Sequence, residues 1–559
     1  MTGPRTAAGP SRRGVLGGAV GLSVAALAGC TDGPAAPPSV AATPVARSSV
    51  ANAATPVAGS SVATTSVAAS VPATPSATAV RATAATTSGS RSAPTAADWR
   101  ALAAGLAGSL VLPGDAGYDG AREVYNTRFD GVRPAAVVRC ATPADVSAVL
   151  AFRRRFGLAV VPRGGGHSYL GASTGTGAVV LDTGPMAQVR YDAASATATV
   201  GAGARLIDVH AALDRSGVAV PAGSCPTVGI AGQTLGGGQG VAAHAYGLTC
   251  DTVTGLQVVT ADGRVREVDG RREPDLFWAL RGGGGGTGAV VTSFRLTPFR
   301  TDDCAVWSAR WPWASAAAVV AGWQRWVASM PAGDWGNVHL EAAGGQPAVR
   351  VSGVALGGDA APALAALTAA VGADPASTSD GRHTWLDTMV LEAGCSRTGY
   401  QACHLTPAGS LTRERFVAGS SVFRAALPAA GIAALTGLVA ARARAGRTAA
   451  VIVDPLTGAV SRGSTSTSAY PWRGALASVQ WYVSLASASA AAARDAAGFV
   501  ARARRAMRPW SVGAYVNYPD ASVADPREYH GSTAGRLARV SARYDPDQVF
   551  RTPTGVPAA

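Results

Sequence analysis

The sequence predicts an α+β fold made of two unlike regions. In the first region short apolar strands alternate with glycine-rich turns, and a strand, a helix and a second strand lead into the first of these turns. After Phe299 the pattern changes to longer alanine-rich helical runs mixed with strands. The length of 559 residues exceeds the usual size of one hydrophobic core. We therefore expect two domains, at 97–300 and 301–504, followed by a closing segment at 505–559.

Residues 1–30 have the pattern of a targeting signal. Arg12 and Arg13 precede an apolar run at 15–27, which is too short to span a bilayer as a helix. The twin arginines resemble a Tat signal, and the residues Leu-Ala-Gly-Cys that end at Cys30 resemble a lipobox, in which the cysteine is lipid-modified and becomes the new N-terminus. The alternative is an ordinary secretory signal in which the arginine pair and Cys30 occur by chance.

The segment at 31–96 is predicted to be a disordered linker. It consists almost entirely of Ala, Thr, Ser, Val and Pro, and the stretch at 42–53 is repeated with small changes at 54–65. A chain of this composition has no large apolar side chains to bury and stays extended. We expect it to hold the folded body away from a membrane.

The first strands and helix of the folded body are predicted directly after the linker. Residues 134–140 alternate as a strand. Thr142 and Pro143 then supply the capping residue and the first-turn proline of a helix that continues to about Arg155. Residues 158–162 form the next strand, so this part of the chain is expected to be a β-α-β unit.

A hairpin and a short helix are predicted before the change of pattern at Phe299. Residues 256–260 and 265–268 flank an Asp-Gly turn, which is typical of a two-stranded hairpin. Residues 275–281 then run into five glycines at 282–286. In the second region we expect helices at 314–330, 360–371, 429–447 and 488–507 and strands that include 346–354 and 478–484.

Two glycine-rich turns carry the chemistry of the first region. They have the sequences PRGGGHSY at 162–169 and AGSCPTVGIAGQTLGGGQG at 222–240, and each follows a short apolar run. Glycine lets the backbone approach a bulky anion closely, because it has no Cβ and tolerates positive φ. Each turn also carries one reactive side chain, His167 or Cys225. The pair indicates a large phosphate-bearing cofactor that is held at two points.

This motif pair resembles the berberine-bridge-enzyme-like flavoprotein oxidases of the vanillyl-alcohol-oxidase fold, which have a PCMH-type FAD-binding domain. The resemblance covers the chain from about Asp98 to its C-terminus. It implies FAD attached covalently, with His167 bonded to the flavin 8α-methyl carbon and the Cys225 sulfur to flavin C6. The expected cofactor-binding residues are Arg163, Gly164, Gly165, Gly166, His167, Ser168, Cys225, Gly229, Gly232, Gly236, Gly237, Gly238 and Asn517. The amides at 164–166 and 236–238 are suited to the pyrophosphate.

The resemblance also implies the roles of the two later parts of the chain. The second domain corresponds to a substrate domain, an antiparallel sheet backed by helices, and the closing segment returns to the FAD-binding domain. Three positions depart from the family pattern. Thr287 replaces an Asn in the element after the five glycines, Thr533 replaces another Asn, and Gln239 stands where relatives often have a tyrosine.

The candidate catalytic residues come from the closing segment and from the turn that contains Cys225. Oxidation of an alcohol requires a base for the hydroxyl proton, and a tyrosine can serve if its pKa is lowered from about 10. The resemblance offers Tyr518 as the base and Tyr515 as a pocket residue, with Asn517 contacting the flavin. Val228 corresponds to a residue that admits oxygen to the flavin. Gln480 is equally compatible with a pocket and with a surface strand.

The expected function is a secreted, lipid-anchored FAD oxidase that converts a hydroxyl, plausibly on a sugar or oligosaccharide, to a carbonyl or lactone with release of hydrogen peroxide. Tat export suits a protein that binds FAD before it crosses the membrane. The alternative is a non-catalytic cell-surface lipoprotein that keeps the fold for binding, which the three departures favour. The expected partners are a small-molecule substrate and oxygen.

Charge and cysteine content limit other functions. The net charge of +14 arises from arginine alone, and the densest clusters, at 442–447 and 502–505, lie in helical pattern without interleaved aromatics, so nucleic-acid binding is not favoured. No CxxC or HExxH motif supports a zinc site. Of the cysteines left after Cys30 and Cys225, we expect Cys395 and Cys403 to form a disulfide because they are close in sequence, the alternative being two buried thiols.

Overall fold

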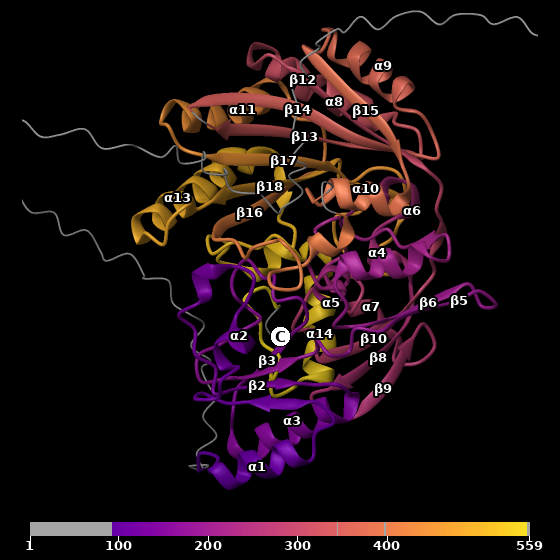
Figure 1. Ribbon diagram of the computed structural model, residues 1–559. Helices are drawn as coiled ribbons and strands as arrows, with labels where there is room; N and C mark the ends of the chain where they lie inside the picture. Colours follow the sequence, from indigo (N-terminus) through magenta and orange to yellow (C-terminus); the bar gives the residue numbers. More distant parts are fainter. Residues whose placement is uncertain (1–91, 344, 396–398, 556–559) are drawn as a thin grey trace, which may run out of the picture.

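A computed structural model describes residues 92–343, 345–395 and 399–555 of the chain. The predicted signal, with Arg12, Arg13 and Cys30, and the linker as far as residue 91 lie outside the described residues. The described chain forms two lobes, with the first half of the sequence in the lower lobe and the large sheet with its helices in the upper lobe (Figure 1). The mixed α+β fold predicted from the sequence is confirmed.

The first sheet of the lower lobe has four strands in the order β1-β2-β4-β3. Its strands are β1 (Ser109–Val111), β2 (Ala136–Arg139), β3 (Val160–Arg163) and β4 (Val179–Asp182). Strands β2, β4 and β3 run parallel, and the helix α3 (Pro143–Phe156) connects β2 to β3. The side chain of Thr142 accepts from the amide of Asp145 and the Asp145 side chain binds the Thr142 amide, so α3 begins as the sequence predicts.

The second sheet of the lower lobe is antiparallel and has the order β5-β6-β10-β8-β9. Its strands are β5 (Val189–Asp192), β6 (Thr197–Gly201), β8 (Val253–Thr260), β9 (Val265–Asp269) and β10 (Ala289–Leu296). The predicted hairpin is confirmed as the pair β8 and β9. The short strands β7 (Val218–Ala219) and β11 (Phe299–Arg300) pair separately.

The upper lobe is built on an antiparallel eight-stranded sheet in the order β15-β12-β14-β13-β17-β18-β16-β19. The strands are β12 (Cys304–Trp311), β13 (Asp334–Ala343), β14 (Gln346–Leu356), β15 (Ser377–His383), β16 (Phe416–Phe423), β17 (Ala449–Pro455), β18 (Ala477–Ser484) and β19 (Ser511–Gly513). The helices α8 (Ala316–Ala328), α9 (Ala360–Val371), α11 (Ala429–Arg444) and α13 (Ala490–Met507) cover the face away from the lower lobe (Figure 1). This leaves the other face of the sheet toward the lower lobe.

The end of the chain connects the two lobes. The predicted start of the closing segment at 505 lies inside α13, and β19 still pairs with β16 in the upper sheet. The chain then crosses back, and α14 (Ala534–Tyr544) packs in the lower lobe beside α7 (Pro274–Ala279). Leu537 joins the buried core of that lobe. The chain between β19 and α14 therefore runs along the junction of the lobes.

The remaining helices are short. They are α1 (Ala96–Ala104), α2 (Tyr118–Arg122), α4 (Leu206–Asp214), α5 (Ile230–Leu235), α6 (Ala243–Tyr246), α10 (Trp385–Glu392) and α12 (Ala459–Arg462). The predicted disulfide between Cys395 and Cys403 is confirmed. Cys140, Cys250 and Cys304 are buried free thiols.

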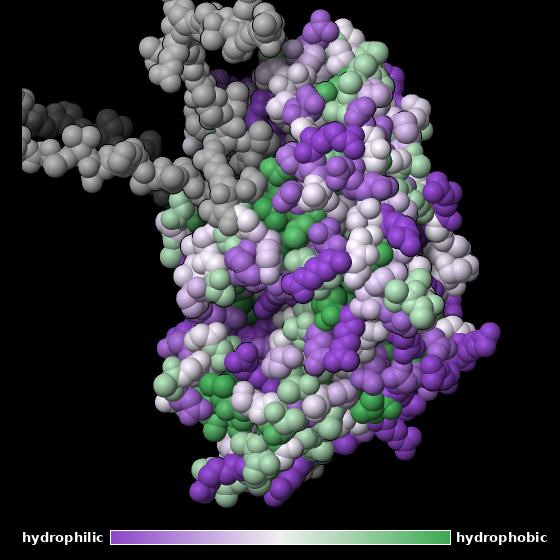
Figure 2. All heavy atoms as spheres, turned by 45° about the vertical axis from the view of Figure 1, so that its right-hand side comes forward, coloured by the Kyte–Doolittle hydropathy of each residue, from purple (hydrophilic) through white to green (hydrophobic). Residues whose placement is uncertain are grey.

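The helices of the described residues can be compared with the requirements for crossing a membrane. None of the helices in the described ranges combines the length and the apolar character that crossing a bilayer requires. On the face seen in Figure 2, hydrophobic residues form small separate patches between hydrophilic ones.

Candidate active site

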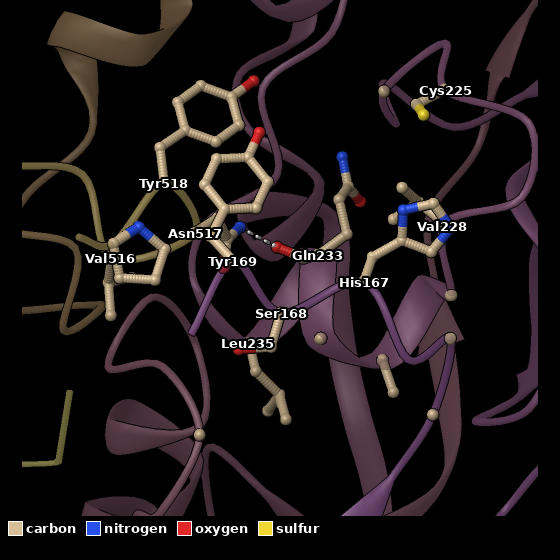
Figure 3. Close-up of a pocket in the computed structure, with 18 of the residues that line it drawn as sticks. His167, Ser168, Tyr169, Cys225, Val228, Gln233, Leu235, Val516, Asn517 and Tyr518 are labelled. Carbon is tan, nitrogen blue, oxygen red and sulfur yellow. Dashed lines mark hydrogen bonds between the residues drawn. The ribbon is translucent and has the colours of Figure 1, made fainter. Parts of the chain in front are cut away.

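A cavity of about 340 Å³ lies between the two lobes and collects residues from both glycine-rich turns, the upper sheet and the closing segment. His167, Cys225 and Val228 lie at one end of the view in Figure 3, and Tyr169 and Tyr518 lie at the other. The cavity therefore brings together the reactive residues that the sequence places far apart.

The ring of His167 is held on one side by Tyr125 and at one nitrogen by Thr227. The Tyr125 and His167 rings stack with centroids 3.9 Å apart, and the Thr227 hydroxyl lies 2.9 Å from Nε2. Burial and then the charge of Arg205 hold the pKa of His167 well below its usual value, so the ring is neutral. In the described chain Nδ1 has no hydrogen-bond partner. With its one proton on Nε2, which then donates to the Thr227 hydroxyl, the ring has at Nδ1 the lone pair that a nucleophile needs.

The two glycine-rich turns touch each other behind His167. A Cβ on Gly165 would stand 2.1 Å from the Gly229 nitrogen, and a Cβ on Gly229 would clash with Gly165 in return. Gly166 has φ of +74°, which disfavours other residues. Arg205 joins the turns by donating to the carbonyl oxygens of Gly165 at 2.5 Å and Thr227 at 3.1 Å. Sequence reasoning did not find Arg205, since nothing in the local pattern marks it.

The amides of Gly164, Gly165 and Gly166 are available to a ligand. Within the described ranges these three amides donate to no acceptor in the chain, and all three residues line the cavity. A cluster of unpaired backbone amides is suited to an anionic phosphate. Ser168, Gly229 and Gly232 line the same cavity.

The predicted role of Gly236, Gly237 and Gly238 is wrong. Their amides donate within the protein, to the carbonyl oxygens of Gly232 at 3.3 Å and Thr234 at 3.0 Å and to the Tyr515 hydroxyl at 3.0 Å, respectively. None of the three lines the cavity. They are glycines because side chains crowd them: a Cβ on Gly236 would lie 2.0 Å from the Asn517 oxygen. This triplet packs the closing segment against the lower lobe and does not cradle phosphate.

Arg163 lines the cavity, but its guanidinium group is tied to the protein. It pairs with Asp182 at 3.0 Å and donates to the carbonyl oxygens of Ala121 and Glu123. All of these partners belong to the lower lobe. The guanidinium therefore anchors the first glycine-rich turn. The predicted contact of Arg163 with a cofactor would have to be made by its backbone atoms.

The closing segment supplies the other end of the site. Tyr518 stacks on Tyr169 with centroids 5.6 Å apart, and the Gln480 amide donates to the Tyr169 hydroxyl at 2.5 Å. Gln480 is thus a buried pocket residue, not a surface residue. Asn517 donates to the Tyr515 hydroxyl and to the carbonyl of Gln233, each at 2.9 Å (Figure 3 shows the latter).

The pKa values of the two tyrosines do not fit the simplest form of the prediction. Burial is the main cause that raises the pKa of Tyr515 and of Tyr518 above the usual value of 10, and electrostatic coupling to the Tyr169 hydroxyl adds to it at Tyr518. The expected lowering of the Tyr518 pKa is therefore absent in the protein itself. A tyrosine in this environment stays protonated at neutral pH.

A buried carboxylic acid beside Tyr518 was missed by sequence reasoning. Asp454 on β17 lines the cavity and accepts from the Asn337 amide of β13 at 3.0 Å. Burial raises its pKa to about 6, an effect that the Asn337 hydrogen bond opposes. Its charge in turn contributes to the raised pKa of Tyr518, and both residues line the cavity. The pKa of Asp454 therefore lies closer to neutral pH than that of an ordinary aspartate.

The three departures from the family pattern are accommodated in the structure. The Thr287 hydroxyl donates to the Gly284 carbonyl at 3.4 Å, and the Thr533 hydroxyl bonds to the carbonyls of Ala469 and His530. The side-chain oxygen Oε1 of Gln239 accepts from the Ser478 hydroxyl at 2.8 Å.

The residues present fit FAD. Free amides at one turn suit its pyrophosphate, the neutral His167 and the Cys225 sulfur face one cavity, and close packing of Gly165 against Gly229 makes the narrow backbone cradle that such a cofactor needs.

Comparisons with known proteins agree with this assignment. Residues 134–269 match the family described as "FAD binding domain", and residues 514–557 match "Berberine and berberine like". A chitooligosaccharide oxidase from Gibberella zeae is 29% identical over 451 residues, covering 77% of this chain and 89% of that protein.

Solved structures show the same fold. Physcomitrella patens BBE-like 1 superimposes with a TM-score of 0.75 at 28% identity, covering 82% of this chain and 99% of that one. Glucooligosaccharide oxidase from Acremonium strictum, which has a 6-S-cysteinyl, 8α-N1-histidyl FAD, has a TM-score of 0.72 at 26% identity and covers 82% of this chain and 99% of its own.

Proposed function

We propose, from the premise that the chain is an FAD-linked oxidoreductase of the berberine-like family, that it oxidises a hydroxyl group of an oligosaccharide to a carbonyl or lactone. The observation that carries this proposal is the single cavity lined by His167, Cys225, Tyr518 and Asp454. We also propose that FAD is bonded covalently to His167 and Cys225. Oxygen is the proposed electron acceptor and is reduced to hydrogen peroxide, which is released.

The protein's own groups hold the substrate and take up its proton. FAD held by His167 and Cys225 would supply the hydride acceptor for the substrate carbon and the route of the electrons to oxygen. Tyr518 faces the cavity with its hydroxyl and contacts the substrate hydroxyl. Because burial keeps Tyr518 protonated, the proton released from the substrate must pass beyond its oxygen. Asp454, with a pKa of about 6, is ionised at neutral pH and accepts it.

An oligosaccharide suits the wall of the cavity that the upper sheet provides. Asn337, Asp454 and Gln480 present an amide, a carboxyl and a second amide from neighbouring strands, and Trp335 adds a flat apolar ring. Sugars combine hydroxyl groups with apolar faces, so such a wall can bind both. Relatives that act on chito-, xylo- and glucooligosaccharides support the substrate class.

A substrate screen tests the proposal. Purified protein is offered a panel of oligosaccharides and simple alcohols, and hydrogen peroxide is measured. We expect release with at least one oligosaccharide and a decrease in kcat/KM on the order of 100-fold or more for Tyr518→Phe. Tyr246→Phe, an exposed position outside the cavity, is the matched control and should keep full activity. No release with any sugar, from protein that carries FAD, would refute the proposed substrate class.

We also propose export by the Tat route and attachment to the outer face of the cell membrane through lipid on Cys30. The support is the twin-arginine and lipobox pattern of the sequence together with the linker that follows it.

A further inference from the structure

A chain of three hydrogen bonds runs from Arg350 to Asp454 through the upper sheet. Arg350 on β14 donates from Nη2 to His339 Nδ1 at 3.0 Å, His339 on β13 is 2.9 Å from the Asn337 oxygen through Nε2, and the Asn337 amide reaches Asp454 at 3.0 Å. Arg350, His339 and Asn337 are all less than 5% exposed, at 3%, 3% and 4%. Of these four residues, Asn337 and Asp454 line the cavity and the other two do not. The series of hydrogen bonds therefore links the site to the interior of the sheet.

Arg350 fixes the direction of every bond in this chain. A guanidinium group can only donate, so His339 Nδ1 must accept. Burial and then the charge of Arg350 hold the pKa of His339 well below its usual value, so the ring is neutral and its one proton is on Nε2. His339 therefore donates to Asn337, which must present its oxygen to the ring. The Asn337 NH₂ group is then turned toward Asp454.

An amide turned in this way favours the ionised form of its acceptor. If Asn337 were free to rotate, it could present its oxygen to a protonated Asp454 equally well, and the burial of the carboxyl would favour that state. We infer that Arg350 and His339 are positioning residues, which hold the Asn337 NH₂ group on Asp454 and so keep Asp454 a carboxylate at the substrate end of the cavity. This inference rests on the proposed function, because it assigns Asp454 the task of taking up the substrate proton.

Other polar and charged groups near this series of hydrogen bonds hold the Arg350 guanidinium in place. Glu341 accepts from Arg350 Nε at 3.3 Å and Ser352 accepts from Nη1 at 2.5 Å, so the guanidinium is held in place. Arg310 on β12 adds positive charge near His339 and Arg350.

Two acidic groups face Asp454 from other elements. Glu392 of α10 is buried, which raises its pKa to about 7, and Arg350 opposes that shift. Tyr518 lines the same cavity as Asp454, interacts with it electrostatically and stays protonated. A test must therefore change the hydrogen bonds and leave the charges of Arg350 and Glu392 in place.

Substitution of His339 meets that condition. His339→Leu breaks the chain and keeps both charges, whereas His339→Gln retains an oxygen to accept from Arg350 and an NH₂ group to donate to Asn337. With the flavin-loaded enzyme and the best sugar from the screen, kcat/KM is measured between pH 4.5 and 8.5. Wild type should lose activity as the pH falls through about 6. We call this decrease the acid limb. We expect its midpoint to be about one pH unit higher in His339→Leu and to be back at the wild-type value in His339→Gln.

A merely structural role for His339 predicts a different result. It would lower kcat/KM by the same factor at every pH and leave the acid limb in place, and this outcome overturns the inference. If His339→Leu does not fold, His339→Met takes its place beside His339→Gln. It also keeps the charges of Arg350 and Glu392, and it should move the acid limb upward as leucine does.

A stability measurement separates this inference from the proposed function. The folded pKa of Asp454 lies above its unfolded value of about 4. Stability is therefore lost as the pH rises from about 4 to the folded pKa and is level above it. Asp454→Asn removes this loss, so we compare the Tm of each protein with and without this substitution. As the pH rises, the Tm difference should increase up to about pH 6 in the wild-type background. In the His339→Leu background it should increase up to about pH 7. Equal end points in both backgrounds overturn the inference, even if no sugar is oxidised.

Discussion

His167 and Cys225 are the residues at which the proposed covalent attachment can be tested directly. Each faces the cavity from a different turn, and His167 is neutral with Nε2 occupied by Thr227. We expect His167→Ala and Cys225→Ala each to retain FAD through one bond and the double variant to bind it only non-covalently. The measurement is flavin absorbance in the pellet after acid precipitation under reducing conditions, with intact mass as a check. Flavin in the pellet of the double variant would contradict the assignment.

Val228 tests the proposed use of oxygen. It lines the cavity three residues after Cys225, lies within the second glycine-rich turn and packs against the core of the lower lobe. Leucine there would fill the small apolar space that oxygen must enter. We expect Val228→Leu to slow reoxidation by air by about tenfold, equivalent to about 1.4 kcal/mol, with anaerobic reduction by substrate nearly unchanged. Stopped-flow measurement of both half-reactions decides this, since equal loss in both would indicate general damage and no loss in reoxidation would mean that Val228 is no gate.

At the residue scale, sequence patterns located the reactive side chains but not the groups that tune them. Gly164–166 and Gly236–238 look alike in sequence, yet only the first set has free amides. The second set is occupied because Tyr515 and Asn517 arrive from the far end of the chain, which no local pattern records. Asp454 was missed for the same reason: its neighbours in sequence form an ordinary buried strand, and its role arises from the lobe that it faces.

At the scale of elements, the contact between the two glycine-rich turns is sensitive to a single methyl group. A Cβ at position 165 would lie 2.1 Å from a backbone nitrogen, which cannot move without separating the turns. We expect Gly165→Ala to destabilise the protein by about 1–3 kcal/mol and to lower FAD incorporation. Gly120→Ala in α2 is the control, because nothing lies within 4 Å of a Cβ there. Thermal unfolding and the flavin-to-protein absorbance ratio check this. Unchanged values for Gly165→Ala would mean that the turns need not touch.

Elements with local signals were predicted well, whereas their arrangement was not. The helix α3 has its capping box and first-turn proline, and the β8 and β9 hairpin has its Asp-Gly turn, so both are confirmed. The order of the upper sheet, in which β13 pairs with β17, depends on contacts between strands separated by whole helices. Short-range sequence pattern carries no information on such pairs, and the wall of the cavity, where Asn337 meets Asp454, is set by this pairing.

At the scale of the whole molecule, the site is complete only when the first glycine-rich turn and the closing segment are both in place. The cavity joins the first turn, near residue 165, to the closing segment near residue 517, and Asn126 of the lower lobe binds the carbonyl of Phe416 in the upper lobe at 3.0 Å. A cofactor held between such distant segments requires a folded chain. A protein of this kind is best exported after folding, which supports the proposed Tat route.

The last prediction concerns that route and the proposed lipid anchor. Replacing both Arg12 and Arg13 by lysine should trap the FAD-loaded precursor inside the cell, because the Tat pathway requires the arginine pair. Cys30→Ala should release the exported protein from the membrane fraction, since the described ranges contain no helix able to cross a bilayer and lipid at Cys30 would be the attachment. Cell fractionation with an antibody to the folded body measures both. Cys30→Ser is a second variant that must behave like Cys30→Ala, and continued membrane association of both would exclude the lipid anchor, while normal export of the double lysine variant would exclude Tat.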